Sequence, residues 1–239
     1  MAYILEVNHY VKQFHLHALN NKRIQALNDV SFRIRPGEIV GLVGKSGSGK
    51  STLMKGVYRT YLSTSGEIRY DSARYGTVDL ATASDHQIIA LRKEEITYCA
   101  QFLSVIPRVP AVDVVAASLF SRGVDKPEAR SRSRDYLQRL GLPEELWDAY
   151  PSTFSGGEQQ RINVARAIIA RPRLLLIDEP TASLDQKAKD VVIAMILDLK
   201  NQGTSVLCIS HDGYTLERMT DRLIELRAGK IVESVTAEL

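Results

Sequence analysis

Apolar and polar residues alternate near the start of this chain and later give way to short, unbroken apolar runs. Alternation over residues 3–8 and 24–34, with a polar loop at 15–22 between them, predicts two antiparallel strands. A second strand pair is expected at residues 67–70 and 74–80. The N-terminal part therefore predicts an antiparallel β subdomain.

The unbroken apolar runs predict strands that are buried on both faces, as in a parallel sheet. They lie at residues 39–43, 96–100, 174–177 and 205–210. Helical periodicity separates them, with Ser84 as a helix cap and with Gly123 and Pro127 expected to break the middle segment. The expected helices are 53–58, 84–92, 111–140, a segment ending near 170, and 186–200, followed by a terminal hairpin at 222–232.

Strands that alternate with helices predict an α/β fold with a mostly parallel sheet covered by helices. We expect one domain over residues 1–239. Within it, residues 1–101 and 171–239 form the α/β core together with the antiparallel subdomain, and residues 102–170 form a helical subdomain.

Composition narrows the functional classes. The 239 residues carry 31 basic and 28 acidic side chains, a net charge of +3. This balance argues against nucleic acid as the main partner. The two cysteines lie in apolar runs, which favours a reduced, cytoplasmic protein. No apolar run approaches the roughly 18 residues of a membrane span, and Met1 does not begin a signal peptide. We therefore expect no direct membrane insertion.

The strongest chemical signal follows the run at 39–43. It matches G-x-x-x-x-G-K-[ST], the phosphate-binding P-loop, in the required strand–loop–helix context. Glycines let backbone N–H groups surround phosphate oxygens, a lysine reaches the phosphates, and a hydroxyl holds Mg²⁺. The nucleotide-binding residues expected here are Gly44, Ser46, Gly47, Ser48, Gly49, Lys50, Ser51 and Thr52, with Ser51 as a metal ligand.

Two acids end the apolar run at 174–177. Asp178 is expected to help hold Mg²⁺. Successive strand residues point to opposite faces, so Glu179 can face the terminal phosphate and polarise the attacking water. His211 follows another buried run, at a strand end where ligands bind in open parallel sheets.

Taken in order, these motifs resemble those of ATP-binding-cassette (ABC) ATPases, which are P-loop NTPases with a RecA-like core. The further matching positions are Gln101, Phe154-Ser155-Gly156-Gly157-Glu158 and Ser183-Leu184-Asp185. The resemblance implies ATP and Mg²⁺ as ligands, ATP hydrolysis, and a homodimer or a dimer with a related ABC subunit.

The same resemblance implies roles for single residues. Phe14 stacks on adenine, and Gln101 joins the metal to the helical subdomain. Ser155, Gly156 and Gly157 contact the terminal phosphate bound by the partner protomer. Asp185 belongs to the D-loop, and Glu179 and His211 act in catalysis.

Plainer interpretations exist for some of these residues. Phe14 can be ordinary packing, because Tyr10 is nearby. Ser155 and Glu158 form a capping box, which needs no ligand. The family usually has Gln at 158 and Leu at 154, and an acid in the first helical turn offsets part of the helix dipole unless it turns back into the cap.

Three segments, residues 101–110, 145–147 and 151–161, closely resemble the L-subunit family of bacterial carbon–phosphorus lyase systems. That family is associated with making α-D-ribose 1-methylphosphonate 5-triphosphate in phosphonate catabolism. The resemblance implies the carbon–phosphorus lyase core complex as partner. The helical subdomain, and especially residues 102–115 with apolar side chains near Arg108, is expected to be the docking surface.

Two other classes share these motifs. One is a transport ATPase of the lipoprotein-release or macrolide-export type, bound to a membrane permease. The other is an interaction module that binds ATP and hydrolyses little.

Overall fold

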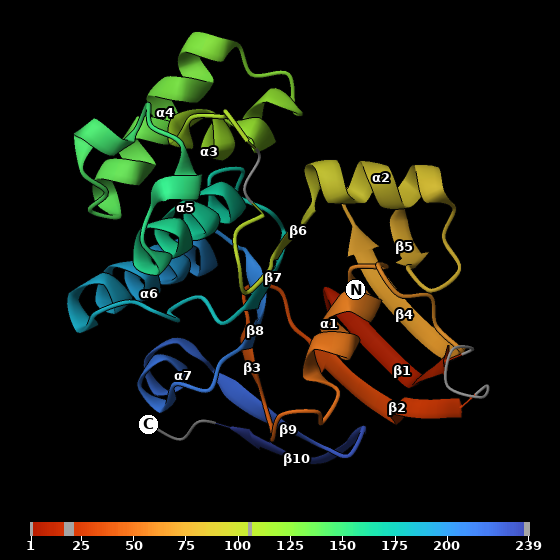
Figure 1. Ribbon diagram of the computed structural model, residues 1–239. Coiled ribbons are helices and arrows are strands. Elements are labelled where there is room, and N and C mark those ends of the chain that lie inside the picture. Colours follow the sequence, from red (N-terminus) through yellow and green to blue (C-terminus); the bar gives the residue numbers. More distant parts are fainter. Residues whose placement is uncertain (1, 17–21, 105–106, 237–239) are drawn as a thin grey trace.

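The computed structural model describes residues 2–16, 22–104 and 107–236, and its strands form two sheets (Figure 1). The first sheet is antiparallel, in the order β2-β1-β4-β5. Its strands are β1 (Leu5–Leu16), β2 (Lys22–Ile34), β4 (Ser65–Ser72) and β5 (Gly76–Asp79). The expected antiparallel subdomain is thereby confirmed.

The second sheet has the order β10-β9-β3-β8-β7-β6 and is parallel except for its last hairpin. Its strands are β3 (Ile39–Val43), β6 (Ile96–Cys99), β7 (Leu174–Asp178), β8 (Ser205–Ile209), β9 (Arg222–Arg227) and β10 (Lys230–Thr236). The mostly parallel sheet is therefore confirmed. The terminal hairpin is also present, and its first strand lies parallel to β3 inside the main sheet.

The helices lie on both sides of this sheet, and α3, α4 and α5 gather at one end of the molecule (Figure 1). They are α1 (Lys50–Val57), α2 (Asp85–Glu94), α3 (Ala111–Phe120), α4 (Lys126–Arg139), α5 (Gly156–Ile168), α6 (Gln186–Asn201) and α7 (Gly213–Met219). Two short 3₁₀ turns, Glu144–Leu146 and Pro151–Thr153, precede α5.

Three sequence expectations need correction. Pro127 does not break a helix: it lies in the first turn of α4, where its missing N–H is not needed, and Asp125 caps that turn. The first helix begins at Lys50 rather than at residue 53, directly after the glycine loop. No helix was expected at 213–219, where α7 forms. Val105 and Ile106 of the expected docking segment lie outside the described residues.

The buried strands β3, β7 and β8 divide their side chains between two cores. Leu175, Ile177, Val206 and Cys208 face α3, α5 and α6, whereas the residues between them face α1 and the antiparallel sheet. Neighbouring strand residues point to opposite faces, so an unbroken apolar run supplies both cores at once.

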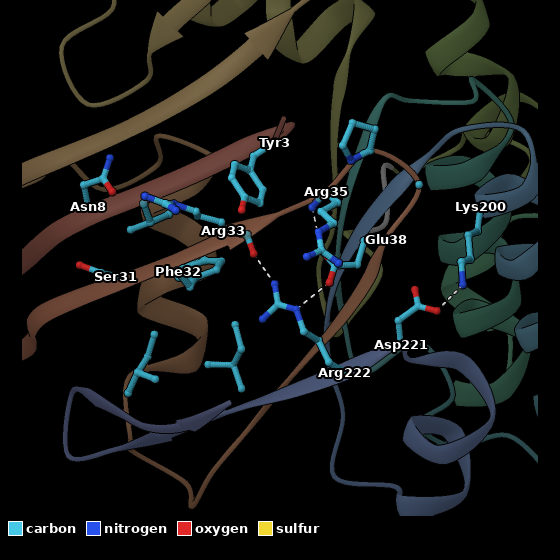
Figure 2. Close-up of a pocket in the computed structure, with 15 residues that line it drawn as sticks. Tyr3, Asn8, Ser31, Phe32, Arg33, Arg35, Glu38, Lys200, Asp221 and Arg222 are labelled. Carbon is cyan, nitrogen blue, oxygen red and sulfur yellow. Dashed lines mark hydrogen bonds and ion pairs between the residues drawn. The ribbon is translucent and has the colours of Figure 1, made fainter. Parts of the chain in front are cut away.

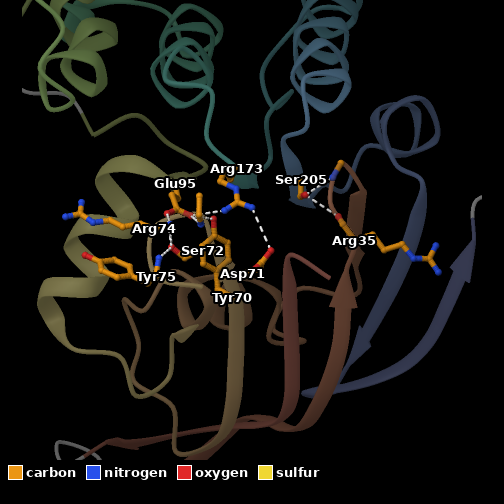
Figure 3. A network of polar contacts seen from close by, with 11 residues as sticks. Arg35, Tyr70, Asp71, Ser72, Arg74, Tyr75, Glu95, Arg173 and Ser205 are labelled. Atoms are coloured by element: carbon orange, nitrogen blue, oxygen red, sulfur yellow. Dashed lines mark hydrogen bonds and ion pairs between the residues drawn. The ribbon is translucent and has the colours of Figure 1, made fainter. Parts of the chain in front are cut away.

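A buried carboxylate joins the two sheets at the start of β6 (Figure 3). Glu95 is 5% exposed and accepts hydrogen bonds from Tyr70 Oη (3.0 Å) and Ser72 Oγ (2.8 Å). It also accepts from the backbone N–H of Ala73 (3.1 Å) and Arg74 (3.2 Å). Glu95 also forms an ion pair with Arg173, which lies 3.4 Å away and precedes β7.

The charge on Glu95 is stabilised by these donors. Burial raises the pKa of Glu95, but the hydrogen bonds from Ser72, Ala73, Tyr70 and Arg74 together hold it below its usual value. A carboxyl group whose pKa is lower in the folded state stabilises the fold above its ordinary pKa of about 4.3. That contribution is lost as the pH falls through the folded-state pKa.

We therefore predict that Glu95→Gln lowers the free energy of unfolding at pH 7 by about 2–4 kcal/mol, because one amide group cannot accept all four hydrogen bonds. The loss should shrink as the pH is lowered below about 4. Denaturant titrations at pH 7 and at about pH 3 measure both effects. Glu94→Gln is the matched control, since Glu94 is an exposed partner of Arg74 and should change stability little. Equal effects of the two variants would contradict the assignment.

Candidate functional site

Strands β3, β7 and β8 lie side by side and in parallel, so their carboxyl ends meet at one edge of the sheet. A cavity of about 540 Å³ opens at this edge. It is lined by residues at the ends of β7 and β8, by the loop between β3 and α1, and by the start of β2. The sequence-predicted residues that line it are Ser46, Gly47, Ser48, Gly49, Lys50, Ser51, Thr52, Gln101, Asp178, Glu179 and His211.

The loop between β3 and α1 depends on glycine at two close approaches. Gly44 has φ 142°, and a Cβ there would lie 2.1 Å from the Leu226 carbonyl oxygen. Gly49 has φ 110° and caps α1, and a Cβ there would lie 2.8 Å from the Ala26 carbonyl oxygen. No side chain caps α1, so the N–H groups of its first turn face the cavity loop as donors for an anion.

Lys50 is buried, and its Nζ donates to the carbonyl oxygens of Gly44 (2.6 Å) and Lys45 (3.1 Å). Burial lowers its pKa, although Glu179 and Asp178 oppose this. The Oγ of Ser51 donates to Asp178 Oδ2 over 3.3 Å, and burial raises the pKa of Asp178. Both pKa shifts favour the uncharged forms of Lys50 and Asp178. An added phosphate would favour the lysine cation, and an added divalent cation would favour the carboxylate.

Glu179 sits just beyond β7 in a left-handed conformation, with φ 52°. Two hydrogen bonds fix its backbone, from its N–H to the Ile209 carbonyl oxygen (2.8 Å) and from Gln160 Nε2 to its own carbonyl oxygen (2.9 Å). Its side chain points toward the ring of His211, with Oε1 3.8 Å from Nε2. Burial raises the pKa of Glu179, opposed by the backbone N–H and the ring of His211. A carboxylate with a raised pKa is a stronger proton acceptor than an ordinary one, which suits a group that polarises water.

Unsatisfied polar atoms indicate that the cavity fits a phosphate and a metal. Within the described part of the chain, the buried Ser48 Oγ and Glu179 Oε1 have no hydrogen-bond partner. Nor do these residues include a cluster of three or more His, Cys, Asp or Glu side chains that could hold a metal alone. Ser51, Asp178 and Gln101 can therefore hold Mg²⁺ only together with oxygens from a bound phosphate or water.

Other sequence-predicted residues lie apart from this cavity. Ser155 and Gly156 are exposed at the start of α5, where a Cβ on Gly157 would lie 2.9 Å from the Ser183 carbonyl oxygen. Asp185 caps α6, accepting a hydrogen bond from the backbone N–H of Ala188 (2.8 Å). The chain thus places residues 155–157, here called the signature segment, beside its own D-loop at residues 183–185. Both lie outside the cavity at the phosphate loop.

The Glu158 carboxylate is turned back into the cap of α5. It accepts from the backbone N–H and the Oγ of Ser155, both over 2.8 Å, and these bonds lower its pKa. The Glu158 carboxylate therefore serves the cap of its own helix.

Phe14, the aromatic residue expected to stack on adenine, does not itself line the cavity. Phe14 pairs across the sheet with Ile24, which lines the cavity, while the Phe14 ring packs edge to face on Tyr61 with centroids 5.1 Å apart. Lys12 Nζ lies 4.7 Å from the same ring. Tyr10, the alternative aromatic, is fully buried and cannot reach a ligand.

A second cavity, of about 790 Å³, lies at the opposite, amino-terminal edge of β3 (Figure 2). Its charged residues largely pair with one another. Arg222 Nε donates to Glu38 Oε1 (2.6 Å), and Lys200 pairs with Asp221. Parallel sheets bind ligands at their carboxyl edge, so this cavity is not the candidate nucleotide site.

Sequence reasoning missed Gln160, whose amide fixes the Glu179 backbone, and Ile24 at the cavity rim. Neither carries a local signal, because each is brought to the site from a distant element. Among residues 2–16, 22–104 and 107–236, no helix combines the length and apolar character needed to cross a membrane.

Comparisons with known proteins agree with this geometry. The chain resembles the dimeric ATP-binding cassette MJ0796, solved in a post-hydrolysis state with ADP and Pi, at a TM-score of 0.89 and 27% identity over 98% of this chain and 99% of that one. It is 35% identical over 213 residues to the lipoprotein-releasing system ATP-binding protein LolD of Hyphomonas neptunium, covering 89% of this chain and 90% of that protein.

The oligopeptide transport ATP-binding protein OppD of Mycobacterium tuberculosis is 32% identical over 98% of this chain, which spans 39% of that protein's length. A model of the ABC transporter family matches residues 27–182, from the second strand through the acids after β7. The chain therefore belongs to the ABC transporter family, in which it forms an ATPase domain.

Proposed function

We propose that this chain binds ATP with Mg²⁺ at the carboxyl edge of its sheet and hydrolyses it as one half of a dimer. One observation carries the proposal. The phosphate loop, Asp178, Glu179 and His211 line one cavity, whereas Ser155 and Gly156 are exposed elsewhere on the same chain and do not line it. A site that uses both sets needs two chains, either two copies or this chain and a related ABC subunit.

Each residue has a role in this proposal. The glycine loop and Lys50 bind the phosphates, and Phe14 contributes to the adenine side. Ser51, Asp178 and Gln101 hold the metal, which supplies charge neutralisation on the phosphates. Glu179 polarises the attacking water. His211, which lies beside the Glu179 carboxylate, acts on the terminal phosphate.

The partner's segment 155–157 and its Asp185 complete the site across the dimer. Exposed N–H groups at the start of α5 suit an anion, and the capping role of Glu158 leaves them available. The dimeric structure of the cassette MJ0796 supports this arrangement.

We further propose that ATP turnover acts on a partner docked on residues 102–170. Gln101 lines the nucleotide cavity and is followed by Phe102, whose surface is 75% exposed. Leu103 is buried in the core shared with α3 and α5, so it anchors the segment that presents Phe102. A change at Gln101 can therefore move an exposed aromatic residue of the kind that is enriched at interfaces.

Two classes of partner are proposed, a membrane permease and the carbon–phosphorus lyase core. The relatives LolD and OppD, named for a lipoprotein-releasing system and for oligopeptide transport, favour a membrane permease. Residues 101–110, 145–147 and 151–161 favour instead the carbon–phosphorus lyase core, through their resemblance to its L-subunit family. In that case the chain supports formation of ribose 1-methylphosphonate 5-triphosphate in phosphonate catabolism.

Glu179→Gln should retain ATP binding and lower hydrolysis about 10²-fold, roughly 2.7 kcal/mol of barrier, because it removes the group that polarises water. Slow hydrolysis should trap the dimer. Size-exclusion chromatography with ATP and Mg²⁺ and a steady-state ATPase assay measure both effects. A Glu179→Gln chain that stays monomeric with ATP, or hydrolyses at the wild-type rate, would contradict the proposal.

Lys50→Ala and His211→Ala should separate binding from turnover. Lys50 lies among the phosphate-binding groups of the ground state, so its loss should weaken ATP affinity measured by calorimetry. His211→Ala should leave that affinity nearly unchanged and slow turnover. Equal losses of affinity in the two variants would overturn this division of roles.

Purification of the tagged chain from phosphate-starved cells, followed by mass spectrometry, should recover the partner. A permease supports the transport alternative, and phosphonate-pathway subunits support the lyase alternative. Phe102→Ala should reduce recovery of either partner, whereas Tyr75→Ala, an exposed aromatic in the turn between β4 and β5, should not. Undiminished recovery with Phe102→Ala would remove residues 102–170 as the docking surface.

A further inference from the structure

The loop that carries His211 is held by a hydrogen-bonded chain of four side chains. Thr181 Oγ1 and Thr215 Oγ1 are 2.8 Å apart, and Thr215 Oγ1 donates to Asp212 Oδ2 over 2.6 Å. Lys189 Nζ donates to the same carboxylate oxygen over 2.9 Å. The four residues come from three places: the segment after β7, helix α6, and the start of α7 with the residue before it.

Hydrogen-bond chemistry fixes the direction of this chain. A threonine hydroxyl has one proton, and Thr215 gives its proton to Asp212. Thr181 must therefore donate to Thr215. The resulting order is Thr181 to Thr215 to Asp212, with Lys189 as the second donor to the carboxylate. The Thr215 hydrogen bond is the largest cause of the lowered pKa of Asp212, so the carboxylate is held ionised.

The chain links the two strand ends that carry the proposed catalytic groups. Thr181 lies two residues beyond Glu179, and Asp212 directly follows His211. Thr181 and Thr215 are 2% and 0% exposed, so water does not compete for the bond between them. On the other side of His211, the N–H of Asp212 donates to Ser210 Oγ over 3.1 Å.

We propose that Thr215 is a positioning residue that sets the placement of His211 relative to Glu179. Its hydroxyl bonds to both sides, to Thr181 after β7 and to Asp212 after β8. It touches neither the phosphate loop nor the cavity. This inference rests on the proposed function, because it requires Glu179 and His211 to act in ATP hydrolysis.

The chain offers closely matched variants for a test. Thr215→Val removes both hydrogen bonds at nearly constant volume, and Thr215→Ser restores the hydroxyl. Thr220→Val is the control. Thr220 is also buried at the end of α7 and bonds by its Oγ1 to the Leu216 carbonyl oxygen over 2.7 Å, away from His211. Thermal unfolding of each variant reports the cost of losing a buried hydroxyl as such.

Thr215→Val should lower kcat for ATP hydrolysis about tenfold while leaving KM and ATP affinity within twofold, since small displacements of positioned groups slow turnover without loss of ground-state binding. Thr215→Ser should recover most of kcat, and Thr220→Val should keep it. In the His211→Ala background, Thr215→Val should have little further effect, because residues that act through one group are not additive.

Additive losses in the double variant, failure of Thr215→Ser to recover kcat, or an equal loss in Thr220→Val would each overturn the inference. Should Thr215→Val fail to fold, Thr181→Val probes the same bond from the other side and should lower kcat in the same way. Unchanged hydrolysis in Glu179→Gln would instead overturn the proposed function. Loss of activity in Glu179→Gln and His211→Ala, with full activity in Thr215→Val, would overturn this inference alone.

Discussion

The candidate nucleotide site at the carboxyl edge of the sheet depends on one constraint, the position of β3 between β8 and β9. β3 pairs in parallel with both neighbours, and β8 pairs in parallel with β7. This order brings the phosphate loop, Asp178 and His211 to one edge, although the loop ends at Thr52, far from His211 in the sequence. The backbone of Gly44 also approaches β9 so closely that a side chain would meet the Leu226 carbonyl oxygen. The conformation of the loop is thus set partly by the strand beside it.

A second joint holds the antiparallel sheet to this framework. Glu95 gathers donors from Tyr70, Ser72 and the turn after β4, and it pairs with Arg173 at the entrance to β7. A buried carboxylate is costly unless its donors are complete, so this network fixes one relative placement of the two sheets. The placement matters for the candidate nucleotide site, because Ile24 near the start of β2 forms part of its rim.

The proposed division of the site between two chains has a local cause. Ser155 begins α5, and Gly157 packs against the backbone of Ser183, which keeps the signature segment beside its own D-loop. The same contact joins the signature segment to the residues that follow Glu179 and Thr181. A short stretch of backbone after β7 therefore connects two sets of groups within one chain. One set would contact the phosphate bound by the partner, and the other would act on the phosphate bound by the chain itself.

Features encoded within a few neighbouring residues were determined by the sequence alone. The phosphate loop, the helix cap at Ser84, the capping box at Ser155, the acids at the end of β7 and the buried strand runs are all local patterns, and the structure contains each of them. The α/β class and the antiparallel subdomain followed from the same patterns. The expectation that Pro127 breaks a helix was wrong. Proline breaks a helix interior but suits a first turn, and the position of that turn depends on the cap at Asp125.

Contacts between distant segments were decided only by the tertiary structure. The insertion of β9 beside β3, the hydrogen bond from Gln160 to Glu179 and the bond between Thr181 and Thr215 each join residues that no local pattern relates. A threonine in a polar loop has many possible partners, and burial between β7 and α7 selects one of them. Strand order and helix packing choose these partners, because hydrogen bonds form over about 3 Å and only the folded chain brings such groups within that distance.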